Sequence, residues 1–201
     1  MDRVAIFIDG SNFYHALKSR FGSASVSFGL LSAKLCGADR RLLRTYYYNA
    51  SKQLEDDPLG DQQRFFSALS KIPYLEVRLG RLERRYTGIG RLDPEKRKAA
   101  EGALGTALPE FTLVEKGVDV QLAVDMVEMA RKNIYDVAVL ITGDGDFSSA
   151  VGAVKDMGKY VELAHVEGQP CRQLQSACDI EVVLDQAFLS NCWVPIGPKK
   201  K

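Results

Sequence analysis

The chain has 201 residues, a formal net charge of +1 at pH 7 and a hydrophobic content of 46%. This length suits one domain with a sizeable core, and a charge so close to zero excludes an overall field that attracts nucleic acid. No apolar run reaches about eighteen residues, so we expect no membrane span. A strand is predicted within three residues of the start, which leaves no room for a signal peptide and favours a cytoplasmic protein.

Hydrophobic periodicity predicts alternating strands and helices through most of the chain. Strands are expected over residues 3–8, 42–50, 74–79, 136–141, 159–164 and 180–184. Helices are expected over residues 11–20, 28–36, 58–72, 117–132, 146–157 and 173–177. This alternation is typical of an α/β domain whose mostly parallel sheet is joined by right-handed crossovers. No linker divides the chain, so we predict a single domain over residues 1–190 and a tail over residues 191–201.

Residues 80–110 interrupt the alternation and are rich in basic side chains, glycine and proline. We expect residues 82–86 and 110–114 to pair as a small antiparallel arm, and residues 88–108 to form a mobile loop between them. A long irregular segment within a compact domain is usually functional or disordered. The arm is therefore a candidate binding element, and a solvated loop is the alternative.

Aspartates follow two of the predicted strands at the points where the strands end. Asp9 ends the first strand, while Asp144 and Asp146 follow the strand over residues 136–141. Numbered along the chain, the strands are expected in the order 3-2-1-4-5, with a switch point between strands 1 and 4, where ligands bind in such sheets. Asp119, in the first turn of the preceding helix, faces the same edge. Each aspartate alone is explained by capping, but together they predict one acidic crevice.

Clustered carboxylates repel one another and raise one another's pKa, and a hard divalent cation relieves that repulsion. Oxygen ligands suit Mg²⁺ or Mn²⁺, which can activate a water against a phosphodiester. We expect Ser11, Asn12 and Thr142 to hold a metal-bound water or a phosphate oxygen, and Lys116 to contact a phosphate. Asp125 lies about 240° further round the helix than Asp119, so we interpret it as a packing or salt-bridge residue.

Two further features suggest contacts to a nucleic acid. Basic side chains between residues 81 and 98, including Arg81, Arg84 and Arg85, are candidates for holding RNA phosphates. The run of tyrosines at residues 46–48 is a candidate base-stacking ring, although core packing accounts better for at least two of them.

Three segments together resemble the motifs of NYN domains, relatives of PIN-like nucleases, and are most similar to the bacterial LabA-like branch. They are Ile8-Asp9-Gly10-Ser11-Asn12-Phe13, Lys116-Gly117-Val118-Asp119-Val120 and Thr142-Gly143-Asp144-Gly145-Asp146-Phe147. The resemblance covers about residues 3–165. It implies a three-layer α/β/α PIN-like (Rossmann-like) fold, a Mg²⁺ or Mn²⁺ site on Asp9, Asp119, Asp144 and Asp146, and RNA cleavage. PIN-like relatives often pair, so a homodimer is one possible assembly, and the sequence leaves the oligomeric state open.

Three other functions match part of the pattern. A small-molecule phosphohydrolase of the haloacid dehalogenase type needs an aspartate where Ser11 stands. A metal-dependent adhesion site of the von Willebrand A type needs a serine where Phe13 stands. A non-catalytic regulator that binds RNA or protein is the third. The presence of all four acids favours chemistry, because unpaired clustered carboxylates reduce stability.

Overall fold

The structure, a computed structural model, describes residues 1–51, 60–88, 91–106, 109 and 111–194. The predicted helix start at residue 58, the arm residue 110 and most of the predicted tail lie outside the described residues. Within the described part of the chain, no helix combines the length and apolar character needed to cross a bilayer.

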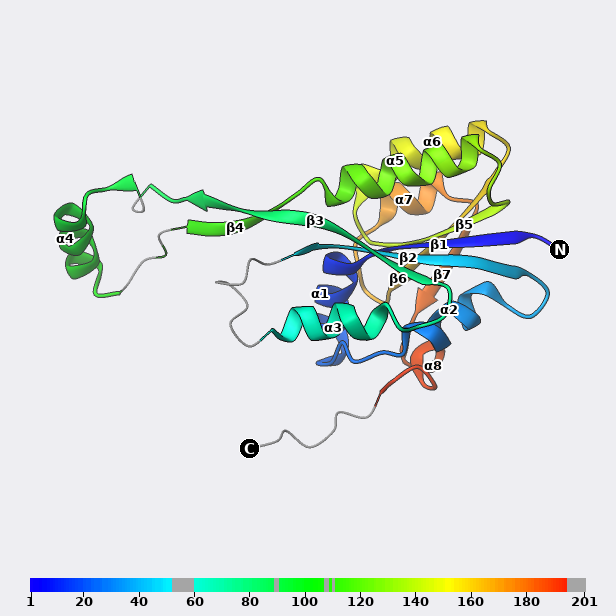
Figure 1. The fold of residues 1–201 in the computed structure, drawn as a ribbon, viewed down its shortest axis with the longest axis horizontal. Helices are drawn as coiled ribbons and strands as arrows, with labels where there is room; N and C mark the ends of the chain where they lie inside the picture. Colours follow the sequence, from blue (N-terminus) through cyan, green and yellow to red (C-terminus); the bar gives the residue numbers. More distant parts are fainter. Residues whose placement is uncertain (52–59, 89–90, 107–108, 110, 195–201) are drawn as a thin grey trace.

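A single mixed sheet runs through the molecule (Figure 1). Its strands are β1 (Arg3–Asp9), β2 (Arg41–Ser51), β3 (Leu75–Tyr86), β4 (Phe111–Lys116), β5 (Val137–Ile141), β6 (Tyr160–Val166) and β7 (Ile180–Leu184). The seven strands lie in the order β4-β3-β2-β1-β5-β6-β7. Neighbours are parallel except for β3 and β4. The predicted α/β class with a mostly parallel sheet is confirmed.

The strand order differs from the prediction at both edges of the sheet. The predicted order 3-2-1-4-5 contains five strands, whereas β4 extends the sheet beyond β3 and β7 extends it beyond β6. The predicted break at Gly80 is wrong, because β3 continues through this residue to Tyr86. A Cβ at position 80 would lie 2.6 Å from Cγ2 of Val118, so the glycine accommodates close packing rather than ending the strand.

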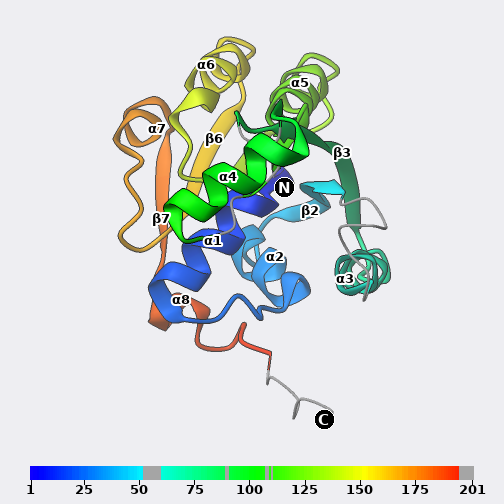
Figure 2. The same cartoon turned by 90° about the vertical axis from the view of Figure 1, so that its left-hand side faces the viewer.

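Helices cover both faces of the sheet and give the molecule three layers (Figures 1 and 2). One face carries α1 (Gly10–Phe21), α2 (Phe28–Cys36), α3 (Asp61–Leu69) and α8 (Gln186–Leu189). The other carries α5 (Val118–Arg131), α6 (Ser148–Asp156) and α7 (Arg172–Ala177). Successive residues of β1 alternate between two buried clusters, with Ile6 and Ile8 in one and Phe7 in the other. A strand covered on both faces is apolar throughout, which explains the continuous run in the sequence.

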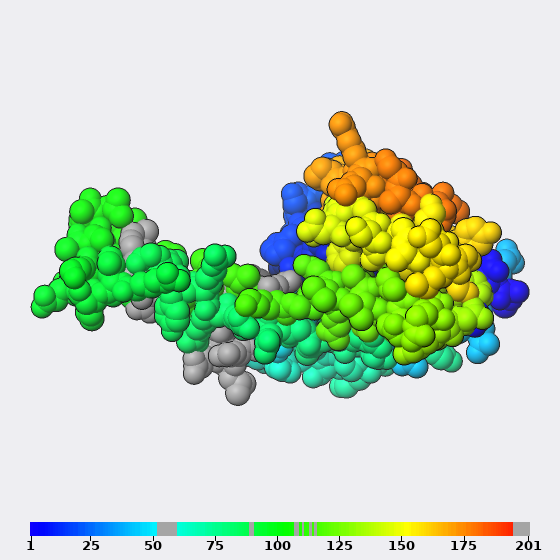
Figure 3. Space-filling view, turned by 90° about the horizontal axis from the view of Figure 1, so that it is seen from above, coloured from blue at the N-terminus to red at the C-terminus, as the bar shows by residue number. Residues whose placement is uncertain are grey.

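The second half of β3 and the whole of β4 form an arm, defined here as residues 81–116. It carries α4 (Pro94–Leu104) at its far end. Figures 1 and 3 show that the arm extends away from the body of the molecule. The predicted antiparallel pairing is present, but the predicted loop contains a helix. Asp93 caps α4 by accepting a hydrogen bond from the Lys96 N–H at 3.0 Å, and Pro94 occupies its first turn. The helix has no buried residue, so it lacks the apolar stripe by which helices are predicted.

The beginning of the predicted tail packs against the body. Trp193 forms an antiparallel bridge with Val26, and the carbonyl of Cys192 accepts a hydrogen bond from the Ser27 N–H at 2.7 Å. Burial of Cys192 and the ring contact between Phe21 and Trp193 account for this packing. Residues 192–194 therefore pack against the segment that leads into α2.

Candidate functional site

Asp9 stands at the carboxyl end of β1, between β2 and β5, and only 5% of it is exposed. Its Oδ1 accepts a hydrogen bond from the Asn12 N–H at 3.1 Å and thereby caps α1. Its Oδ2 accepts a hydrogen bond from the Thr142 hydroxyl at 3.0 Å. One carboxylate thus fixes the start of α1 relative to the end of β5.

Gly10 allows α1 to begin directly against β2. A Cβ at this position would lie 2.4 Å from Cζ of Tyr47 and 2.6 Å from the carbonyl oxygen of Tyr48. Any larger residue would push the helix away from the sheet and displace Asp9. The glycine of this motif therefore has a packing role next to the site.

The loop after β5 presents the next two acids. The Thr142 hydroxyl accepts a hydrogen bond from the Asp144 N–H at 3.1 Å, and Oδ1 of Asp144 accepts one from the Asp146 N–H at 3.0 Å. These bonds start a short 3₁₀ helix, η3 (Gly145–Phe147). Asp144 is half-buried, whereas Asp146 is exposed. The Thr142 hydroxyl is buried, donates to Asp9 and accepts from the Asp144 N–H, so it positions these two acids rather than facing a ligand.

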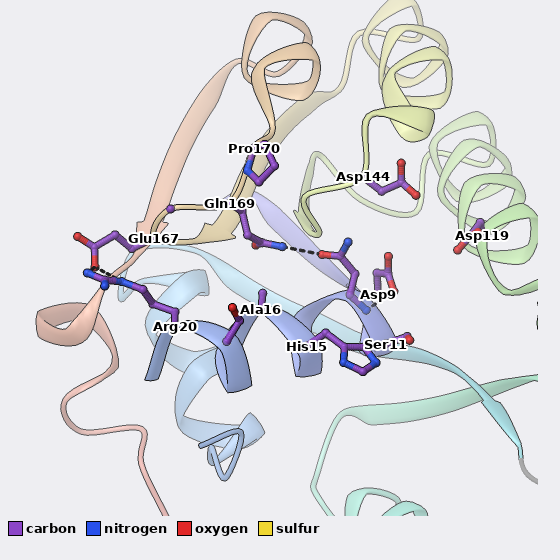
Figure 4. Close-up of a pocket in the computed structure, with 13 residues that line it drawn as sticks. Asp9, Ser11, His15, Ala16, Arg20, Asp119, Asp144, Glu167, Gln169 and Pro170 are labelled. Carbon is purple, nitrogen blue, oxygen red and sulfur yellow. Dashed lines mark hydrogen bonds and ion pairs between the residues drawn. The ribbon is translucent and has the colours of Figure 1, made fainter. Parts of the chain in front are cut away.

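Asp119 reaches the site from the first turn of α5. The Asp119 side chain is exposed, yet partial desolvation and the nearby carboxylates of Asp144 and Asp146 raise its pKa. A pKa that is raised by neighbouring carboxylates indicates that these acids lie close enough to repel one another. Asp119 is joined by Asp9 and Asp144 in the lining of one pocket of about 630 Å³, and Figure 4 shows these three residues coming from separate elements. Asp146 is not among the lining residues.

Asn12 links three loops at this edge of the sheet. Its Oδ1 accepts one hydrogen bond from the Gly143 N–H and another from Nε2 of Gln169, each at 2.9 Å. Gln169 is itself fixed, because its Oε1 accepts a hydrogen bond from the Val166 N–H at 2.9 Å. A Cβ at Gly143 would lie 2.7 Å from Nε2 of Gln169. The glycine therefore makes room for the amide that holds Asn12.

The donor set suits a metal chemically, but its side chains do not form a ready-made cage. The candidate ligands are all carboxylates, the class that Mg²⁺ and Mn²⁺ prefer, and a cation would relieve the repulsion felt by Asp119. Among the described residues, however, no group of three or more His, Cys, Asp or Glu side chains is arranged to hold a metal ion. Binding would require side-chain rotation, for which the exposed Asp119 and Asp146 have room.

Of the remaining predicted residues, one lies at the pocket and the basic ones lie on the arm. Ser11 lines the pocket beside Asn12. Lys116 and Arg81 lie on the arm, where both form ion pairs with Glu83, at 2.8 and 3.4 Å. Arg84 places its guanidinium over the Phe111 ring at 4.6 Å.

Arg85 is exposed on the same arm, and none of these four basic residues lines the pocket. Asp125 behaves as expected of a packing residue: it pairs with Arg78 and accepts a hydrogen bond from the Tyr48 hydroxyl at 3.0 Å.

Sequence reasoning missed several residues that line the pocket: His15, Arg20, Glu167 and Gln169. Arg20 and Glu167 form an ion pair at 2.7 Å across the pocket rim. Ser11, His15 and Ser19 are spaced four residues apart on α1, so they share one helical face. This spacing could have predicted that His15 lines the pocket together with Ser11. Residues 167–170 follow β6 at the carboxyl edge, so the rule that identified Asp9 and Asp144 also applied to them.

Comparisons with known proteins agree with this architecture. The family model described as NYN domain matches residues 3–185. The low amplitude and bright protein LabA of Synechococcus elongatus is 27% identical over 177 residues, which cover 88% of this chain and 81% of LabA. A protein of unknown function from Vibrio parahaemolyticus, solved by crystallography, matches with a TM-score of 0.66 and 21% identity. That match covers 93% of this chain and 95% of the other and bears on the fold alone.

Proposed function

Because the chain belongs to the NYN domain family, whose members are typically nucleases, we propose that it is a metal-dependent ribonuclease that hydrolyses RNA phosphodiester bonds. The observation that carries this proposal is the acidic pocket. Asp9, Asp119 and Asp144 line it from three separate elements, and the carboxylates of Asp144 and Asp146 raise the pKa of Asp119. Like charges this close disfavour ionisation, and a divalent cation would relieve their repulsion and could also activate a water against a phosphodiester.

The proposed metal ligands are Asp9, Asp119, Asp144 and Asp146. When bound, Mg²⁺ or Mn²⁺ lowers the pKa of a water and neutralises charge on the phosphate. The Asp9 carboxylate accepts hydrogen bonds from the Asn12 N–H and the Thr142 hydroxyl, and the Asp144 carboxylate accepts one from the Asp146 N–H, so these two acids form the fixed part of the site. Asp119 and Asp146 are exposed and complete it by rotation.

Asn12 and Ser11 are the proposed contacts to the phosphate. The Asn12 carbonyl oxygen accepts hydrogen bonds from Gly143 and Gln169, and its Nδ2 amide donates to none of the residues that the structure describes. An amide donor suits a phosphate oxygen rather than a metal ion. Thr142 and Gln169 act through their neighbours, as positioning residues.

We propose that the basic side chains of the arm bind the phosphates of the RNA backbone. It extends beyond the carboxyl edge of the sheet, the same edge at which the aspartates lie (Figures 1 and 2). Arg81, Arg84 and Arg85 lie along β3, and Lys98 lies on α4 at the far end. Within the described part of the chain, Arg85 and Lys98 have no acidic partner, so both are available for phosphates.

One observation favours a second candidate, a non-catalytic protein that binds RNA. Both oxygens of Asp9 already accept hydrogen bonds, as expected of a residue that stabilises the fold. In that case the acidic pocket would be structural and the arm would carry the function.

Cleavage of end-labelled single-stranded RNA in Mg²⁺, in Mn²⁺ and in EDTA separates the two candidates. The ribonuclease cuts in at least one metal and not in EDTA. RNA that is retained in all three conditions but never cut contradicts the ribonuclease and supports the binding protein.

A further inference from the structure

A second pocket adjoins the acidic one, and Ser11 and His15 line both. Its volume is about 610 Å³, and α1, the end of β2 and α3 supply most of its lining. Pockets of about 300–1,000 Å³ are typical of small-molecule sites. A ligand that enters this pocket therefore lies beside whatever occupies the aspartates.

Two large aromatic side chains of this pocket remain open to solvent. Tyr14 is 47% exposed and Phe65 is 39% exposed. Phe65 makes edge contacts with Phe28 and Tyr47, with centroid separations of 6.2 and 5.8 Å. Tyr14 packs edge-on against His15 at 5.3 Å. Packing thus orients both rings while leaving much of their surface accessible, which is the arrangement of a stacking platform.

Amide side chains supply the polar part of the lining. Asn49 donates a hydrogen bond to the Tyr47 hydroxyl at 3.3 Å, and its Oδ1 accepts one from the Ala50 N–H at 2.8 Å. Gln62 donates to the Ala50 carbonyl at 3.0 Å. These bonds hold both amides in the wall of the pocket and make part of its lining polar.

The charge of the described lining favours a neutral occupant over a phosphate. Of the described residues that line the pocket, none is lysine or arginine, and Asp61 is the one acid. A neutral, flat, partly polar group suits aromatic rings and amides, and a nucleobase has these properties.

We propose that this pocket, between α1 and α3, binds one nucleobase of a single-stranded RNA, with the Tyr14 ring as its stacking partner. The inference rests on the proposed ribonuclease function and adds a base contact next to the cleavage site. The expected stacking ring at residues 46–48 does not serve this purpose, because all three tyrosines are buried. Tyr47 instead forms part of the wall of the pocket.

The test measures binding and cutting of a short single-stranded RNA and of versions with one abasic nucleotide at each position in turn. Tyr14→Ala removes the ring, Tyr14→Phe retains it, and Tyr160→Ala is the matched control. Tyr160 is 64% exposed at the amino end of β6, at the opposite edge of the sheet. Loss of one stacking contact between a base and an aromatic ring weakens RNA binding about tenfold. Circular dichroism verifies that each variant is folded.

The proposal predicts that wild type, Tyr14→Phe and Tyr160→Ala bind the intact RNA about equally and lose about tenfold in affinity when one particular base is missing. Tyr14→Ala binds the intact RNA about tenfold more weakly and no longer senses that missing base. If wild type cuts RNA and Tyr14→Ala behaves identically, the base pocket is wrong and the ribonuclease stands. If wild type binds without cutting and Tyr14→Ala loses the affinity, the ribonuclease is wrong and the base pocket stands. If wild type neither binds nor cuts, both are wrong.

Discussion

Asn12 and Gln169, which lie on α1 and after β6, are joined by a hydrogen bond of 2.9 Å from Nε2 of Gln169 to Oδ1 of Asn12. The bond turns the Asn12 amide so that its nitrogen is left as a donor at the acidic pocket. Gln169 is therefore a positioning residue for the proposed phosphate contact.

Replacement of Gln169 by alanine tests this role. Loss of a partly buried hydrogen bond costs about 1–3 kcal/mol, so we expect the cutting rate to fall about tenfold or more. Gln175→Ala, on the exposed side of α7, is the control and leaves the rate unchanged. If the loss of Gln169 raises KM and leaves kcat unchanged, Asn12 contributes to ground-state binding alone. A Gln169→Ala variant with wild-type kcat and KM contradicts the positioning role.

A methyl group at position 143 should also disrupt the hydrogen bond between Gln169 and Asn12. Its Cβ would lie 2.7 Å from Nε2 of Gln169, so the amide must move away from Asn12. We expect Gly143→Ala to lower the cutting rate about tenfold, as Gln169→Ala does. The matched control is Gly152→Ala on α6, where the added Cβ meets nothing within 4 Å. The double variant Gly143→Ala/Gln169→Ala should be no slower than the single variants, and additive losses would show that the two residues act separately.

The arm should control RNA affinity rather than the rate of chemistry. We expect Arg85→Ala/Lys98→Ala to raise KM and leave kcat within about twofold, because phosphate contacts position the substrate. The slope of log K against log salt should become shallower by about 0.7 for each phosphate that the variant no longer neutralises. The control is Arg41→Ala/Lys71→Ala, which removes two exposed charges near the amino ends of β2 and β3. An unchanged salt slope in the arm variant would assign the arm another role.

Stability in acid should depend on the ion pair that joins the start of β1 to the start of β5. The side chain and the backbone N–H of Arg3 donate hydrogen bonds to Asp136, and they hold the pKa of Asp136 well below its usual range. A carboxyl whose pKa is lower in the folded state stabilises the protein above its unfolded pKa of about 3.9, and this contribution is lost as the pH falls towards the folded value.

Asp136→Asn should therefore unfold at a lower urea concentration than wild type at pH 7, and the difference should shrink below about pH 4. Asp156→Asn is the control, because Asp156 is exposed and forms no ion pair within the described part of the chain. A difference between wild type and Asp136→Asn that stays constant from pH 7 to pH 3 contradicts this account.

The sequence was most informative where burial is complete. β1 and β5 were predicted to within one residue at each end, because strands covered on both faces are continuously apolar. The positions of Asp9 at the end of β1 and of Asp144 in the loop after β5 followed from the same runs. The helix α4 was missed because it buries nothing and so has no periodicity, although the capping signal of Asp93 and Pro94 was present.

Contacts between distant loops were harder to foresee. The bond between Asn12 and Gln169 joins residues 157 positions apart, on α1 and in the loop after β6, and it depends on how β1, β5 and β6 are aligned in the sheet. The position of Gln169 after β6 indicates the carboxyl edge of the sheet but does not identify Asn12 as its partner. The extension of β3 through Gly80 depends likewise on the approach of Val118, which the local sequence does not specify.

The most direct measurement compares RNA cutting and RNA retention by wild type, Asp144→Asn and the control Asp156→Asn in the same Mn²⁺ buffer. Asp144 lies in the acidic pocket, so its neutralisation should reduce cutting at least about 100-fold while RNA retention stays within about twofold. Asp156→Asn should match wild type in both. Equal cutting by wild type and Asp144→Asn would contradict the assignment of the acidic pocket as the catalytic site.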